Sequence, residues 1–319
     1  MTRSVAVCLL IFFVTLLLAP LAGSADISLS KAFAGTSPDK EILFQARLPR
    51  VLLAALTGAA LAITGVLFQC LLRDPLAEPY TLGVSSGASV GAVLAICLGF
   101  RSTGIASLAG AAAVLFLVLG LAWESRRVSS FSLLLSGVTM NSMAFAVILL
   151  LHNLADFSQS FAISRWLMGG IEAVEYSRLL WVSLLVLAIA AAVILGARKW
   201  NLMAVSEDWA AARGVDTVRQ MTWGYIAGAA LTGIVTSLAG PIGFVGLIVP
   251  HALRLRLGAD HRQLLPCSFL VGGAFLALCD TISRTILAPI EIPVGVITAL
   301  LGGPFFVWLL LTRRRSLWM

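Results

Sequence analysis

The residue types that usually carry chemistry are sparse in this sequence and form no recognised catalytic or metal-binding pattern. The histidines, His152, His251 and His261, lack ligand spacing, and the five cysteines include no CxxC pair. The sequence also contains no GxxxxGK[ST] nucleotide-binding motif, no HExxH motif and no matched Ser–His or carboxylate pair. We therefore expect no metal, no cofactor and no enzymatic activity in this chain itself.

One pair of arginines stands directly before a long apolar run. The stretch "QARLPRVLLAAL" (45–56) sets Arg47 and Arg50 three residues apart, directly before a long apolar run. Anchoring of a helix end at a membrane interface is one interpretation of such arginines, and the residues alone leave their role open.

The composition places these arginines at the edge of a membrane. Of 319 residues, 60% are hydrophobic and 12% are charged, and the mean hydropathy is +1.00. A soluble domain needs more charge to cover its surface, and apolar runs of about 18–20 residues recur along the chain. The net charge of +7 is typical of basic cytoplasmic loops, so we expect no nucleic-acid partner. The sequence predicts an all-α polytopic membrane protein.

The apolar runs predict about ten membrane spans in one transmembrane domain covering residues 1–319. They are 4–22, 47–72, 85–100, 104–124, 130–152, 177–197, 220–239, 244–256, 265–286 and 293–312. An even number puts both termini on one side, and the basic tail 312–319 marks that side as cytoplasmic. The first run also fits a cleaved signal peptide, so both interpretations stay open there.

Small residues and helix breakers indicate which spans pack closely against a neighbour and which are interrupted. Gly83, Gly87 and Gly91 follow one another at four-residue spacing, which lets helix backbones approach closely in lipid. The stretch "AGPIGFVGLIVPHALRLRLG" (239–258) carries several glycines and prolines, and such a broken backbone needs surrounding protein or water. The stretch 165–176 is too short and too broken to span, and we expect there a helix that dips into the outer face or lies on it.

The cytoplasmic segment 198–220 carries the pattern of a short isolated helix. An N-cap, two acids in the first turn, a basic last turn and a glycine stop follow in order as Ser206, Glu207 and Asp208, Arg213, and Gly214. A helix of about two turns is marginal in water by itself. Its mixed charges and alanine-rich side with Trp209 fit a protein groove better than lipid.

Eight segments, taken in order, resemble the permease subunits of ATP-binding-cassette (ABC) importers for iron chelates, haem and cobalamin, the FecCD-type family. They are "RLPRVLLAALTGAALAITGVLFQ" (47–69), "RDPLAEPYTLGVSSGASVGA" (73–92), "LLLSGVTMN" (133–141), "RWLMGG" (165–170), "ARGVD" (212–216), "GPIGFVGLIVPH" (240–251), "DHRQLLP" (260–266) and "EIPVGVITALLGGPFFVWLL" (291–310). The second and sixth segments are the most specific, and the resemblance covers the chain from about residue 45 onward.

The resemblance implies a type II ABC importer permease with about ten helices per subunit, in the bacterial cytoplasmic (inner) membrane. It implies three partners: a second permease subunit in a homodimer or close heterodimer, a cytoplasmic ABC ATPase dimer, and an extracytoplasmic substrate-binding protein. A ferric siderophore is the expected cargo, and haem and cobalamin remain alternatives. An ion-coupled secondary transporter is the alternative of another class, but it requires an ionisable residue at mid-membrane. The spans offer only Asp280, near the outer end, and His251, in the broken span.

The resemblance also implies roles for individual residues. The expected docking residues for the binding protein are Arg47, Arg50 and Arg284; a structural pair of Arg284 with Asp280, one turn earlier, stays open. The expected ATPase-coupling residues are Ser206, Glu207, Asp208, Ala211, Arg213 and Gly214. The expected gate and pathway residues are Asp74, Leu76, Thr139 and Asn141, where helix–helix hydrogen bonding is the alternative for the last two. Relatives often have Asn at the position of Asp74, so this chain carries an added negative charge there and the detailed chemistry of the gate stays open.

Overall fold

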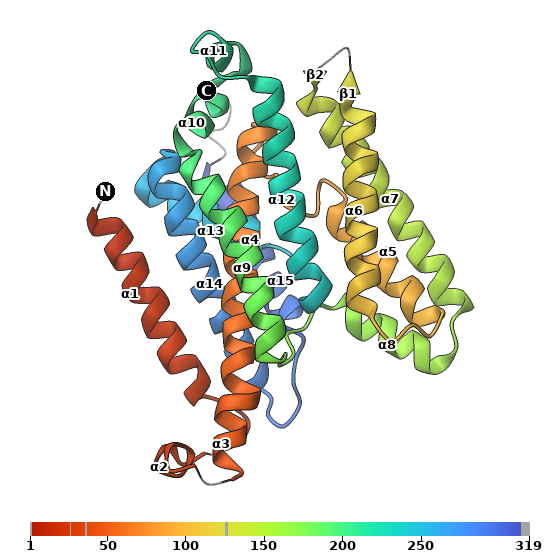
Figure 1. The fold of residues 1–319 in the computed structure, drawn as a ribbon, viewed down its shortest axis with the longest axis vertical. Helices are drawn as coiled ribbons and strands as arrows, with labels where there is room; N and C mark the ends of the chain where they lie inside the picture. The colour runs from red at the N-terminus through yellow and green to blue at the C-terminus, as the bar shows by residue number, and fades with distance from the viewer. Residues whose placement is uncertain (1, 26, 36, 125–126, 314–319) are drawn as a thin grey trace.

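The computed structural model describes residues 2–25, 27–35, 37–124 and 127–313, and it is nearly all helical (Figure 1). This confirms the predicted all-α polytopic fold. The helices that overlap the predicted spans are α1 (Thr2–Leu18), α4 (Leu48–Leu72), α5 (Val84–Cys97), α6 (Thr103–Ala122), α7 (Ser130–Leu154), α9 (Tyr176–Leu195), α12 (Thr217–Ala239), α13 (Val245–Leu257), α14 (His261–Thr285) and α15 (Val294–Arg313). Within the described ranges, seven helices are long and apolar enough to cross a membrane, while α5 and α15 are shorter apolar helices.

The remaining elements are short and connect these helices. They are η1 (Ala19–Leu21), α2 (Leu29–Phe33), α3 (Asp39–Glu41), the π-helical η2 (Ile42–Arg47), α8 (Phe157–Leu167), α10 (Ala197–Val205) and α11 (Glu207–Ala211), with an antiparallel strand pair β1 (Trp123–Glu124) and β2 (Arg127–Val128). The end of the predicted cytoplasmic tail, 314–319, lies outside the described residues.

Helix α4 forms the centre of the molecule. Its residues from Leu53 to Leu71 are all buried, whereas α6, α7 and α9 expose large apolar side chains such as Phe116, Phe145 and Trp181. Glycines let its neighbours approach: a Cβ added to Gly65 would lie 1.8 Å from the carbonyl oxygen of Gly246 in α13. Because glycine has no side chain, the two backbones can come into direct van der Waals contact, which is a common way for helices to associate in lipid.

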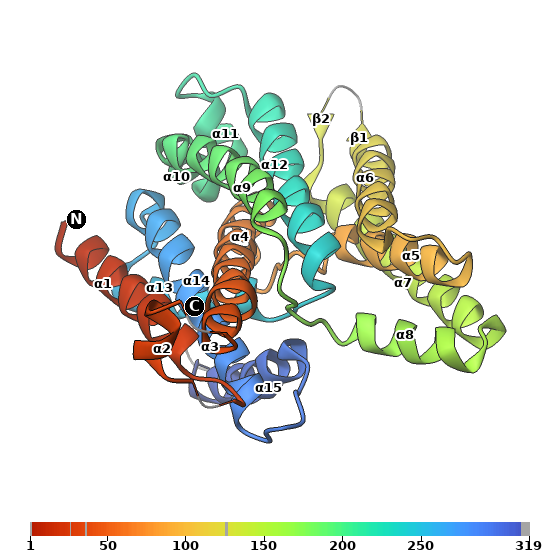
Figure 2. The ribbon, with the colours of Figure 1, turned by 60° about the horizontal axis from the view of Figure 1, so that its bottom comes forward.

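Helices α5 to α8 form the other side of the molecule, away from α1 and α14 (Figures 1 and 2). A Cβ added to Gly87 would lie 2.6 Å from the carbonyl oxygen of Gly110, and one added to Gly91 would lie 2.1 Å from that of Ala106, both in α6. Gly83 differs from these two, because it is the N-cap of α5 with a φ of +76°. The predicted glycine row therefore serves one helix start and one helix crossing.

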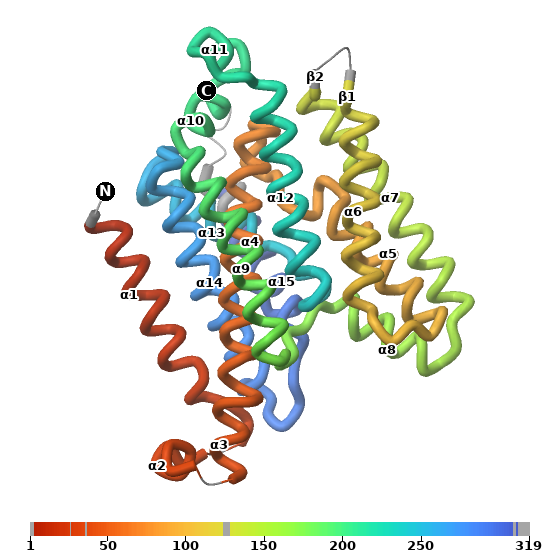
Figure 3. Tube along the Cα trace, viewed as in Figure 1, coloured from red at the N-terminus to blue at the C-terminus, as the bar shows by residue number. Residues whose placement is uncertain are grey.

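Side-chain caps account for the starts of several helices. The N-cap residues whose side chains accept a first-turn amide are Ser102 for α6, Ser129 for α7, Asp156 for α8, Asp216 for α12 and Asp260 for α14. Helix α4 instead continues directly from η2 and ends at Arg73, whose φ of +51° is left-handed. The tube view follows the chain from there into the connection that leads to α5 (Figure 3).

Two local predictions are wrong in their boundaries. The outer-face helix lies at 157–167, and residues 169–175 have no helical structure, because the Asp156–Gln159 capping box starts the helix earlier and Gly169, with a φ of +70°, ends it. Helix α11 has five residues instead of about two turns. The broken segment 240–244 lies against the chain after α8, where Gly170 N donates to the carbonyl oxygen of Ala239 at 2.9 Å.

The two ends of the molecule carry different elements. Figure 1 shows both ends of the described chain in the upper half, together with α11 and the strand pair, whereas α2, α3 and α8 lie at the opposite end. The predicted docking residues lie at the end that carries α2 and α3, and the predicted coupling residues lie at the end that carries α11.

Candidate docking and coupling surfaces

An arginine–carboxylate cluster lies at the end of the molecule that carries α2 and α3. Arg50 of α4 binds two carboxylates: its Nε lies 3.0 Å from Asp280 Oδ1 of α14, and its Nη1 lies 2.8 Å from Glu291 Oε2. The Asp280 side chain is fully buried, the Arg50 side chain is 17% exposed, and Glu291, in the connection between α14 and α15, is 49% exposed. Arg50 is therefore held from inside by one acid and from outside by another.

The other two predicted docking arginines face inward. Arg284 Nε lies 3.6 Å from Asp280 Oδ2, and its Nη2 donates to the carbonyl oxygen of Ala19 at 2.7 Å. Arg47 donates to the carbonyl oxygens of Pro20, Leu21 and Ala25. Both arginine side chains are buried, and the accepting carbonyls follow the end of α1, where helix carbonyls lack intrahelical donors. In this conformation Arg50 is the member of the predicted trio that remains partly accessible.

A small cavity opens beside this cluster. It has a volume of about 200 Å³, and its lining includes Arg47, Arg50, Arg284 and Glu291. Three guanidinium groups and one carboxylate at one opening favour an anionic group, because charge complementarity governs which partner groups bind.

The coupling segment at the opposite end has the caps that the sequence predicts. Ser206 Oγ accepts from Trp209 N at 3.0 Å, and Gly214 has a φ of +80°. Asp216 Oδ1 accepts from Arg219 N at 3.0 Å and starts α12. The Arg213 guanidinium stacks 3.9 Å over the Trp209 ring. The segment thus holds its shape through its own side chains, and Trp209 stays exposed.

Sequence reasoning missed what connects this segment to the rest of the protein. The Glu207 carboxylate forms an ion pair with Arg73, at the end of α4. Ser130, the first residue of α7, donates its hydroxyl to the carbonyl oxygen of Leu71 at 2.9 Å and lies 3.4 Å from Glu207 Oε1. Nothing in the sequence indicated this ion pair, because the partner of Glu207 is 134 residues away.

Helix α10, just before the coupling segment, is tied to the start of α14. Asn201 Nδ2 donates to Asp260 Oδ1 at 2.7 Å, and His261 N donates to Asn201 Oδ1 at 2.8 Å. The bond from Asn201 and a backbone bond from Arg262 hold the pKa of Asp260 below its ordinary value.

The predicted gate residues lie in the connection between α4 and α5. Asp74 Oδ1 accepts from Leu76 N at 2.9 Å, an Asx turn, and Leu76 is exposed. An asparagine oxygen would accept the same bond, so the turn tolerates either residue. Glu78, which sequence reasoning overlooked, accepts from Phe244 N at 3.3 Å and joins this connection to the broken segment before α13.

The two polar residues of α7 behave differently from each other. Thr139 Oγ1 donates to the carbonyl oxygen of Leu135 in its own helix at 2.8 Å. Asn141 Oδ1 accepts from Ser86 Oγ of α5, so Asn141 makes the helix–helix bond that the sequence left as an alternative. Both residues are exposed on this chain.

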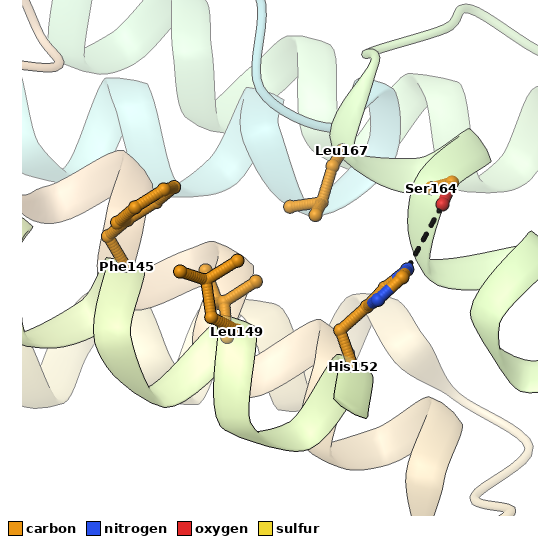
Figure 4. Close-up of a pocket in the computed structure, with 6 residues that line it drawn as sticks. Phe145, Leu149, His152, Ser164 and Leu167 are labelled. Carbon is orange, nitrogen blue, oxygen red and sulfur yellow. Dashed lines mark hydrogen bonds between the residues drawn. The ribbon is translucent and has the colours of Figure 1, made fainter. Parts of the chain in front are cut away.

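An apolar groove lies between α7 and α8 (Figure 4). It has a volume of about 380 Å³ and is lined by Phe145, Ile148, Leu149, His152, Ser164 and Leu167. Its one polar pair is His152 Nε2 and Ser164 Oγ, 3.3 Å apart. Among the residues that the structure describes, no group of three His, Cys, Asp or Glu side chains could hold a metal ion. The groove offers shape and apolar contact.

Comparison with known proteins decides the family, because residues 9–312 match the FecCD transport family. The chain belongs to the FecCD transport family. It is 44% identical to the uncharacterized ABC transporter permease protein YvrB of Bacillus subtilis, over 86% of this chain and 80% of that protein. It is 38% identical to the hemin transport system permease protein HmuU of Yersinia pestis, over 97% of each chain.

A vitamin B12 import permease and a solved structure give the same result. The vitamin B12 import system permease protein BtuC of Shigella boydii is 37% identical, over 96% of this chain and 94% of that protein. A solved metal-chelate type ABC transporter in an inward-facing conformation superposes with a TM-score of 0.86 at 30% identity, covering 97% of this chain and 98% of that chain. The FecCD chain described here is therefore a membrane-embedded permease of an ABC importer.

Proposed function

We propose that this FecCD permease carries an iron chelate, with a ferric siderophore as the expected cargo, into the cytoplasm. The observation that carries the proposal is the match to the family along residues 9–312. Relatives named for hemin and vitamin B12 make haem and cobalamin the alternative cargoes. The metal-chelate type of the superposed transporter supports a chelated metal.

ATP hydrolysis is assigned to a partner. The sequence contains no GxxxxGK[ST] motif, so the proposal places nucleotide on a cytoplasmic ABC ATPase dimer. Helix α11 is the proposed contact, since it exposes Trp209 and is too short to be stable without a neighbour. The end of the molecule that carries α11 and both ends of the described chain would then face the cytoplasm, in a bacterial inner membrane.

The opposite end is the proposed docking site for a substrate-binding protein. An acidic side chain of that protein would enter the cavity beside Arg50, because guanidinium groups bind carboxylates in a planar, bidentate geometry. In the free chain the Glu291 carboxylate pairs with Nη1 of Arg50, so the incoming carboxylate would replace Glu291 there. Arg47 and Arg284 would contribute positive charge to the cavity while holding α1 in place, which also supports a retained first helix.

A second permease subunit is proposed to cover α7. That helix exposes a row of apolar side chains at helical spacing, including Leu135, Val138, Phe145 and Leu149, with Thr139 and Asn141 beside it. Such a row in an ABC permease suits another copy or a close relative of this chain. The pathway would then run along the interface, closed on the cytoplasmic side by the connection around Asp74 and Leu76.

Uptake into sealed vesicles tests the proposed energy source. Vesicles that hold the permease, its ATPase and its binding protein are expected to accumulate cargo with ATP and to stop without it, even under a proton gradient. Accumulation driven by the gradient alone would favour the ion-coupled alternative. Growth of a deletion strain on ferric siderophore, hemin or cobalamin as the single limiting nutrient identifies the cargo.

A further inference from the structure

Glu207 lies where three elements of the permease meet. It is the first residue of α11, and its carboxylate pairs with Arg73 and lies 3.4 Å from the Ser130 hydroxyl. Arg73 ends α4 in a left-handed conformation, and Ser130 begins α7. The Ser130 hydroxyl also donates to the carbonyl oxygen of Leu71, so the ends of α4 and α7 are joined to each other as well as to Glu207.

The other side chains of the coupling segment do not make this connection. Trp209 and Arg213 stack on each other, and Ser206 caps its own helix. For the part of the chain that the structure describes, the side-chain hydrogen bonds and ion pairs from α11 to α4 or α7 all come from Glu207. Asp208, the adjacent acid on the same turn, takes part in none of them.

Arg73 and Ser130 each precede a proposed gate element in the chain. Arg73 directly precedes Asp74 and the exposed Leu76. Ser130 begins the helix that carries Thr139 and Asn141 farther along. The side-chain contacts that join α11 to both proposed gate elements therefore meet at one carboxylate, and packed elements respond to a shift as rigid bodies.

We propose that Glu207 is a positioning residue that transmits the movement of α11 to the α4–α5 connection and to α7. The inference rests on the proposed function, since it needs an ATPase that moves α11. The pair is an exposed one, with side chains 38% and 35% accessible, and such pairs contribute little to folding stability. We therefore expect the pair to couple the movement of α11 to that of the gate. A measurement of gate movement can distinguish this role from a contribution to folding stability.

The test follows Leu76→Cys in the complex with the ATPase, reconstituted in nanodiscs. A membrane-impermeant maleimide labels the new cysteine, and peptide mass spectrometry separates it from the five native cysteines. Labelling rates are compared without nucleotide and with ATP and vanadate. Glu207→Gln keeps the size of the side chain and removes its charge, and Asp208→Asn removes one charge from the same turn as the matched control.

With Glu207→Gln, compared at saturating ATPase so that every permease carries its partner, we expect the nucleotide-dependent change in labelling at position 76 to fall by more than half. Asp208→Asn is expected to keep the full change. Arg73→Glu alone should lose it, and Arg73→Glu combined with Glu207→Arg should recover it, because the ion pair is rebuilt with opposite polarity.

Two results would overturn the inference. Retention of the whole nucleotide-dependent change in Glu207→Gln would show that the gate moves without this carboxylate. Loss of ATPase binding in Glu207→Gln, with Asp208→Asn normal, would show that Glu207 only holds α11 in place. A failure of the proposed function looks different, because the Leu76→Cys parent itself would then bind no ATPase or show no nucleotide response.

Discussion

The two charged clusters at opposite ends of this permease are built in opposite ways. The cluster around Asp280 buries one carboxylate completely between two arginines that are 17% and 4% exposed. The contact between Arg73 and Glu207 leaves more than a third of each side chain exposed. Separating a buried ion pair takes a large free energy, because it leaves an unpaired charge away from water, whereas an exposed pair opens and closes with little change in free energy. The Asp280 cluster is therefore suited to hold helices together, and the Arg73–Glu207 contact is suited to move.

Asp280→Asn tests whether the buried carboxylate stabilises the fold, and we expect it to have the strongest effect of the variants considered. The substitution leaves Arg50 and Arg284 beside a neutral side chain, and removing one partner of a buried ion pair costs about 3–5 kcal/mol. Thermal unfolding of the purified permease in detergent measures the loss. Unchanged stability would show that hydration, or Glu291 for Arg50, already compensates the charge of these arginines, and the contrast between the two ends would disappear.

Glu291→Gln tests the exposed part of the same cluster. If Glu291 competes with the carboxylate of a binding protein for Arg50, the variant should bind that protein about threefold to tenfold more tightly, which corresponds to roughly 1 kcal/mol. Glu172→Gln is the control, because Glu172 pairs with Arg165 at an exposed position outside this cluster.

Surface plasmon resonance with the permease in nanodiscs separates two explanations of such a gain. Equal tightening by Glu291→Gln and Glu172→Gln would indicate general attraction from the changed net charge. Weaker binding in Glu291→Gln would show that Glu291 orients Arg50 for the partner, and the exchange model would be wrong.

Glu207→Gln tests the Arg73–Glu207 contact through stability alone. Because the pair with Arg73 is exposed, the expected loss is at most about 1 kcal/mol, far below that of Asp280→Asn. The same thermal unfolding assay measures both variants. A loss near that of Asp280→Asn would mean that α11 is part of the folded core, and the two ends would no longer differ in kind.

The two clusters also show how far the sequence could lead. Hydrophobic run length predicted the helices, and local signals predicted the caps at Ser206 and Asp216, because both depend on neighbouring residues. The inward orientation of Arg47 depends on carbonyl groups at the end of α1, more than twenty residues earlier. The Glu207 contact joins residues 134 positions apart. Contacts of this kind follow from packing, which residue types in a single sequence do not specify.

The smallest expected effect concerns the junction of α10 and α14, which anchors the coupling segment from the other side. Asn201 and a backbone amide hold the pKa of Asp260 below its ordinary value. The stability that Asp260 contributes is then fully present above the pKa of an unfolded aspartate, about 3.9, and is lost as the pH falls through the lower folded value. Hydrogen exchange of the α10 amides, corrected for intrinsic rates, should therefore accelerate only below about pH 4. Asp260→Asn can still accept both bonds but does not titrate, so it should remove this acceleration; if the acceleration persists, another group controls the junction.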